Sequence, residues 1–177
     1  MPTDWATTVN NLGSAFSKRI RGDWSKSLEQ AIDAFKQALS VRTRDLMPIE
    51  WAATTNNLAS TYCDRIKGDR VENIEQAIDA LKEVLSVTTQ TAMPENWSTF
   101  MNNLALAYSK RIKGDRAENV EQAIDAYKQA LSVRTKEAMP VEWADTQHNL
   151  GSAYSERIRG DKTENIEKAI DVYQQEL

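Results

Sequence analysis

The sequence predicts an all-α fold, a solenoid of antiparallel helix-turn-helix repeats. Three observations support this prediction: a 46-residue repeat, apolar residues at helical spacing in both halves of the repeat, and proline and glycine at fixed positions. Trp5, Trp51, Trp97 and Trp143 recur every 46 residues. A Met-Pro pair precedes each of them in the same phase, and these pairs contain all 4 prolines of the chain. Self-similarity at a period of this length is typical of repeat architectures.

The repeat divides the chain into segments 1–46, 47–92 and 93–138 and a truncated fourth segment, 139–177. We expect the four to form a single solenoid domain, because a lone helix pair cannot bury its apolar stripe. Met1 is in register with Met47, which suggests a fragment of a longer protein that starts at a repeat boundary. Leu177 matches Leu39 in mid-helix. An uncapped end of this kind exposes apolar surface and favours end-to-end stacking.

The first half of each repeat predicts a helix with one apolar face. In the first repeat this face contains Trp5, Val9, Leu12, Gly13, Phe16 and Ile20. Pro2 suits the first turn, where its missing N–H costs nothing. We expect Gly22 to end this helix in a left-handed conformation. The tryptophans share the phase of Leu12, so we expect them in the core.

The second half predicts a second amphipathic helix, with an apolar face formed by Leu28, Ala31, Ile32, Phe35, Ala38 and Leu39. Its start is predicted at a capping box, in which the first side chain caps a backbone N–H and the third residue after it reaches back. Ser27 and Gln30 have this spacing, as do Asn73 with Gln76 and Asn119 with Gln122. In the fourth repeat Asn165 can cap, but Lys168 cannot accept in return.

Composition excludes several functional classes. The 22 basic and 26 acidic residues give a net charge of −4 without a basic stripe, so no nucleic-acid partner is expected. No apolar run reaches the roughly 18 residues of a membrane span. The one cysteine, Cys63, precludes an internal disulfide and fits a reducing, cytoplasmic location.

The apolar pattern resembles the tetratricopeptide repeat. Leu12-Gly13-x2-Phe16 followed by Ala31-x3-Phe35-x2-Ala38 matches the core of that motif, and the other three segments repeat it in phase, the last incompletely. The resemblance implies a right-handed superhelix that binds proteins in a concave groove lined by the first helix of each pair. The period departs from the family's ~34 residues. It is similar to the long variants in bacterial multidomain proteins, where they accompany caspase-like or nucleotide-switch domains.

Two rows of amide side chains are the candidate binding residues. One consists of Asn10, Asn56, Asn102 and His148, and the other of Asn11, Asn57, Asn103 and Asn149. Such side chains offer donors and acceptors that can pair with the backbone of an extended peptide, as the family resemblance also implies. We expect the first row to line the groove. The second row has an alternative, structural role, bridging neighbouring repeats.

An arginine recurs near the end of each first helix, at Arg19, Arg65, Arg111 and Arg157. Each second helix has two acids four residues apart, such as Glu29 and Asp33. Because these acids repel each other, we predict ion pairs between the arginines and the acids across helices or repeats. The alternative is a local pair of Asp33 with Lys36.

No constellation of residues predicts catalysis or a bound cofactor or metal. His148 and Cys63 lack the partners that a catalytic or metal site requires. We therefore expect a non-enzymatic scaffold that binds a protein or peptide partner. The alternative is a structural spacer or self-association module, whose ends stack while its groove stays empty.

Overall fold

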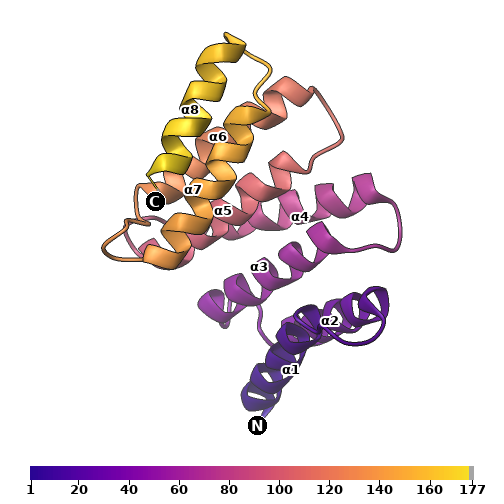
Figure 1. Cartoon of the computed structure of the whole chain (residues 1–177). Coiled ribbons are helices and arrows are strands. Elements are labelled where there is room, and N and C mark those ends of the chain that lie inside the picture. Colours follow the sequence, from indigo (N-terminus) through magenta and orange to yellow (C-terminus); the bar gives the residue numbers. More distant parts are fainter. Residues whose placement is uncertain (176–177) are drawn as a thin grey trace. The chain divides into compact units, whose positions relative to one another are not determined.

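A computed structural model describes residues 1–175, and eight α-helices without any strand make up this part of the chain (Figure 1). The chain divides into two compact units, Met1–Val87 and Thr88–Leu177. The first unit contains α1 (Pro2–Ser17), α2 (Trp24–Leu39), α3 (Pro48–Asp64) and α4 (Arg70–Leu85). The second contains α5 (Pro94–Ser109), α6 (Arg116–Leu131), α7 (Pro140–Ser155) and α8 (Lys162–Gln174). Leu177, the predicted mid-helix end, lies outside the described residues.

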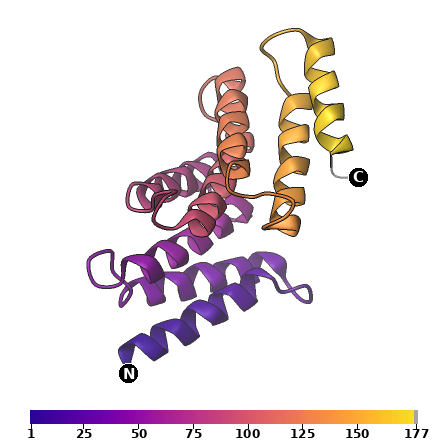
Figure 2. The ribbon, with the colours of Figure 1, turned by 90° about the vertical axis from the view of Figure 1, so that its left-hand side faces the viewer.

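Within each unit, consecutive helices form antiparallel hairpins (Figure 2). In the first unit α1 packs against α2 and α3 against α4, while α2 also packs against α3. The second unit repeats this scheme with α5/α6, α7/α8 and the α6–α7 contact. The predicted all-α fold of helix pairs at 46-residue spacing is therefore confirmed. That the four repeats form one domain stays a prediction.

The first helix of every pair begins with proline at its first position, as predicted: Pro2, Pro48, Pro94 and Pro140. These helices end earlier than predicted. The helix of the first repeat ends at Ser17, five residues before Gly22. Gly22 has a positive φ of 98°, so the left-handed conformation is confirmed, but it belongs to the loop and not to the helix end. Ile20 also lies in the loop and is exposed, contrary to the predicted apolar face.

The predicted capping box is wrong, because each second helix begins one turn earlier. Its cap is the aspartate directly after the loop glycine: Asp23, Asp69, Asp115 and Asp161. The Asp115 carboxylate accepts from the Glu118 backbone N–H at 2.8 Å. Asn119, four residues inside the helix, instead donates to the Lys113 carbonyl oxygen at 2.9 Å and ties down the preceding loop.

The tryptophans differ in burial. Trp51 is 8% exposed and belongs to the core as predicted, whereas Trp97 and Trp143 are half-buried. Trp5 is 46% exposed, so the core prediction is wrong for the first repeat. The loop after α2 explains part of the difference, because it brings the Arg44 guanidinium to 5.9 Å from the Trp51 ring centroid.

Arginine–glutamate pairs connect successive repeats, as predicted. Arg65 Nε and Nη2 donate to the two carboxylate oxygens of Glu29 at 2.8 and 2.7 Å. In the second unit Arg157 makes the same two bonds to Glu121 at 2.7 and 2.9 Å. These arginine hydrogen bonds lower the pKa of both carboxyl groups, with smaller contributions from nearby cations opposing the effect of burial.

A second arginine row escaped the sequence analysis. Arg134 is 4% exposed and donates to the hydroxyls of Thr146 at 2.8 Å and Thr99 at 3.0 Å, which joins α7 to α5. Burial lowers the pKa of this guanidinium. Arg42 makes the matching bonds to Thr54 and Thr7 in the first unit, at 2.8 and 2.9 Å. The sequence holds a signal for this cluster. At the positions 46 residues after Arg42, Thr7 and Thr54, all three residue types change together, to Thr88, Ala53 and Phe100.

Replacement of Trp51 by alanine is expected to lower the free energy of unfolding by about 3–5 kcal/mol, because it removes a buried aromatic ring. The matched Trp5→Ala variant should lose much less, since nearly half of the Trp5 side chain already contacts water. Urea unfolding followed by circular dichroism gives both values. Equal losses in the two variants would contradict the difference in burial.

The Glu29 pair predicts a pH dependence of stability. The native pKa of Glu29 lies below its unfolded value, so its stabilisation is present above the unfolded pKa of about 4.3. That stabilisation is lost as the pH falls through the native pKa. At neutral pH, Glu29→Gln should cost about 1 kcal/mol. As the pH falls toward 3, the variant and the wild type should converge.

Urea unfolding between pH 3 and pH 7 measures this convergence. Glu137→Gln, in the exposed loop between α6 and α7, is the matched control and should leave the pH profile unchanged. A constant gap between Glu29→Gln and wild type at every pH would rule out the ion pair as its source.

Candidate functional site

A groove of about 270 Å³ lies in the first unit, between α1 and α3, with α2 as its floor. One wall comes from α1 and contains Ser14, Ser17 and Lys18. The opposite wall comes from α3 and contains Asn57, Ser60, Thr61 and Asp64. Leu28 and Phe35 of α2 form the floor. The groove therefore combines polar walls with an apolar base.

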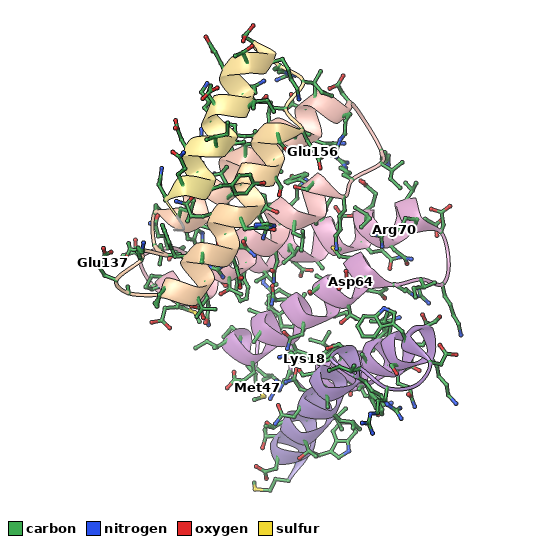
Figure 3. The ribbon with its side chains drawn as sticks, in the orientation of Figure 1. Lys18, Met47, Asp64, Arg70, Glu137 and Glu156 are labelled. Carbon is green, nitrogen blue, oxygen red and sulfur yellow. The ribbon has the colours of Figure 1, made fainter. Side chains whose placement is uncertain are left out.

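Helical spacing places these wall residues on one face of each helix. Asn57, Ser60, Thr61 and Asp64 are three or four residues apart along α3, which brings them onto one side. Lys18 directly follows α1, and Asp64 is the last residue of α3 (Figure 3). Both charged side chains are exposed. One end of the groove therefore presents a cation and an anion, and its walls carry no net charge.

Small residues allow the helices around the groove to approach closely. A side chain at Gly13 would place its Cβ 2.8 Å from Cε1 of Phe35, closer than real contacts allow. The missing Cβ thus lets the Phe35 ring lie against the backbone of α1. This packing fixes the floor of the groove, since the Phe35 side chain is fully buried.

The groove walls have hydrogen-bonding capacity that the fold does not use. The hydroxyls of Ser14, Ser17 and Thr61 donate to carbonyl oxygens of their own helices at 3.2, 3.0 and 2.8 Å. Their lone pairs remain as acceptors. Among the described residues, the Asn57 amide takes part in no side-chain hydrogen bond, so it can offer two donors and an acceptor to a ligand.

The eight amide-row residues occupy different environments. In the first row, Asn56 is buried, Asn10 and Asn102 are half-buried, and His148 is exposed. In the second row, Asn11 is exposed, whereas Asn57, Asn103 and Asn149 are half-buried. Asn57 is the member that lines the groove.

Contacts with neighbouring side chains distinguish several of the amide-row residues from one another. The Asn102 oxygen accepts from the Thr146 hydroxyl at 3.2 Å, whereas the matching Asn10 oxygen is buried without a partner in the described part of the chain. The His148 ring lies 5.7 Å, centroid to centroid, from the ring of Tyr173 in α8, so it packs on its own hairpin.

The second unit has bulkier residues at the matching positions. Leu106 stands where Ser14 lines the groove, and Tyr127 stands where Phe35 forms its floor. Glu156 takes the position of Asp64 and forms an ion pair with Arg116. The first unit therefore has the smaller and more polar residue at the position of Ser14, and a ring without a hydroxyl at the position of Phe35.

Other kinds of site are not evident in residues 1–175. No group of three or more His, Cys, Asp or Glu side chains there could hold a metal ion. None of the described helices has the length and apolarity needed to cross a membrane. Cys63 is buried.

Comparisons with known proteins agree with this architecture. A family model described as "Tetratricopeptide repeat" matches residues 97–135, which is most of the third repeat. The structure is similar to the crystal structure of BtubC (BKLC) from P. vanneervenii, with a TM-score of 0.73 and 19% sequence identity. The match covers 99% of this chain and 63% of that one. A search of the curated proteins finds no match.

Tetratricopeptide repeats generally mediate protein–protein interaction and are typically non-enzymatic. The predicted resemblance is thereby confirmed: the chain has a helical repeat fold, and its third segment matches the tetratricopeptide repeat model.

Proposed function

We propose that the chain is a protein-interaction module whose first unit binds an extended peptide segment in the groove between α1 and α3. The observation that supports this most is the Asn57 amide, which has no side-chain partner among the described residues. It lines the groove beside hydroxyls that donate to their own helix, above an apolar floor. A peptide backbone has the complementary donors and acceptors at every residue. An apolar side chain of the peptide would contact Leu28 and Phe35 at the base.

The residues of the groove define the expected ligand more closely. Lys18 and Asp64 place opposite charges at one end, so neither a strongly acidic nor a strongly basic peptide is favoured by charge. Recognition would depend on backbone hydrogen bonds and on one buried apolar side chain. Each neutral hydrogen bond adds only about 0.5–1.5 kcal/mol, so the peptide must engage several groups together.

The other amide-row residues have a supporting role in this proposal. Asn10 and Asn56, on the two wall helices α1 and α3, are partly and fully buried, so they can help to position these helices beside the groove. A cytoplasmic location is also part of the proposal, because a lone cysteine is typical of a reducing environment. Self-association would use different surfaces and can be tested separately.

Peptides selected from a random library displayed on phage, with the chain immobilised, provide the probe for this proposal. Calorimetry should then show that Asn57→Ala weakens binding of a selected peptide about 2- to 13-fold, the equivalent of one neutral hydrogen bond. Ser14→Leu should abolish binding, because the larger leucine side chain fills the groove. Leucine is the residue at the equivalent position of the third repeat, Leu106. Asn149→Ala, the counterpart of Asn57 in the fourth repeat, is the matched control and should bind normally.

Melting curves of each variant separate lost binding from lost folding. The selected peptides should also lose affinity when backbone N-methylation blocks their hydrogen bonds. Unchanged binding to Ser14→Leu, or the failure to select any peptide, would refute the groove as the binding site.

A further inference from the structure

The outer face of α1 carries the same apolar residues as a face of α3 that is buried, but on α1 this face is exposed. Leu12 on this face is 48% exposed, whereas its counterpart Leu58 in α3 is 8% exposed. The difference follows from the neighbours, because α2 packs against α3 in the place where α1 has no such helix. The first unit thus presents on α1 the apolar face that α3 turns toward α2 and α7 turns toward α6.

The outer face of α8 carries the apolar residues that α2 and α6 bury against the next helix pair, and on α8 this face is exposed. Ile170 is 41% exposed, whereas the matching Ile32 and Ile124 are each 2% exposed. These two isoleucines belong to α2 and α6, each of which packs between two first helices. Ile170 lies on the second helix of the fourth repeat, which packs against α7. It presents the side that would face a following first helix.

Charged residues on the two faces match as well. Inside the chain, the second helix contributes a glutamate to the arginine of the next first helix, as in the Glu29–Arg65 and Glu121–Arg157 pairs. The same positions are Glu167 on α8 and Arg19 after α1. Both are exposed, and neither forms an ion pair among the described residues.

A second pair follows the same register. Arg159 bonds Glu118 at 2.8 Å across the α6–α7 contact. The matching residues on the outer faces are Arg21 and Glu164. Two arginine–glutamate pairs would therefore align at once if α8 of one copy packed against α1 of another copy as α6 packs against α7.

We propose that two copies of this chain associate head to tail, with α8 of one copy packed against α1 of the other. In this contact Glu167 pairs with Arg19, and Ile170 packs against Leu12. Each copy uses two different faces, so the contact is heterologous and leaves one face of each kind open at the ends of the assembly.

The contact should be weaker than the internal ones. The internal Arg116–Glu156 pair would be replaced by Lys162 opposite Lys18, two like charges at the rim. Association should therefore depend on protein concentration.

Sedimentation velocity over a range of concentrations tests the proposal with the whole chain. The wild type is expected to show a concentration-dependent increase in sedimentation coefficient. Arg19→Glu and Glu167→Arg should each raise the dissociation constant at least about tenfold, because each puts like charges together in the contact. Both side chains are exposed, so circular dichroism and melting midpoints should not change.

Mixing the two variants provides the decisive measurement. The mixture then has two favourable contacts: the intact Glu167 of one variant meets the intact Arg19 of the other, and the two reversed charges meet each other. The mixture should therefore associate where neither variant does alone. Glu137→Lys, a charge reversal in the loop between α6 and α7, is the matched control and should associate like the wild type. A wild-type chain that stays monomeric at every concentration would overturn the proposal, as would a mixture that stays monomeric while the wild type associates.

Discussion

The whole structure depends on one packing constraint: the second helix of each repeat has two apolar sides, and its own hairpin covers only one of them. In α2 and α6 the other side is covered by the first helix of the next repeat, α3 and α7 respectively. Ile32 and Ile124 are buried because such a helix is present, whereas the equivalent Ile170 on α8 is 41% exposed. In a chain built this way, stability comes from contacts between neighbours and not from a central core.

The 46-residue period keeps the polar contacts between neighbours aligned. Glu29 meets Arg65 and Glu121 meets Arg157 because both partners recur at the same spacing, so one geometry serves each contact. The buried Arg42 and Arg134 work in the same way through threonine hydroxyls. These arginines are costly to bury, and several hydrogen bonds to each offset that cost.

The sequence predicted the features that follow from periodicity and missed those that depend on local geometry. The helix pairs, their proline starts and the arginine–glutamate pairs all repeat, so a spacing rule finds them. The choice between Asp23 and Ser27 as the cap is different, because both residue types can cap a helix. Only the path of the loop after Gly22 decides it. The amide rows show the same limit, since Asn10 and Asn102 are identical in sequence position but only Asn102 has a threonine hydroxyl as partner.

Comparison of the repeats with one another distinguishes two kinds of position: those with the same residue in all four repeats and those where the residue differs. Asp caps, loop glycines and first-turn prolines are the same in all four repeats, because each serves the backbone of the hairpin. The groove positions differ: Ser14 becomes Leu106, and Thr61 becomes Ala153. The Ser14 and Thr61 side chains line the groove, and their hydroxyls donate to carbonyl oxygens of their own helices. The two units therefore share one arrangement of helices while the residues at the groove positions differ.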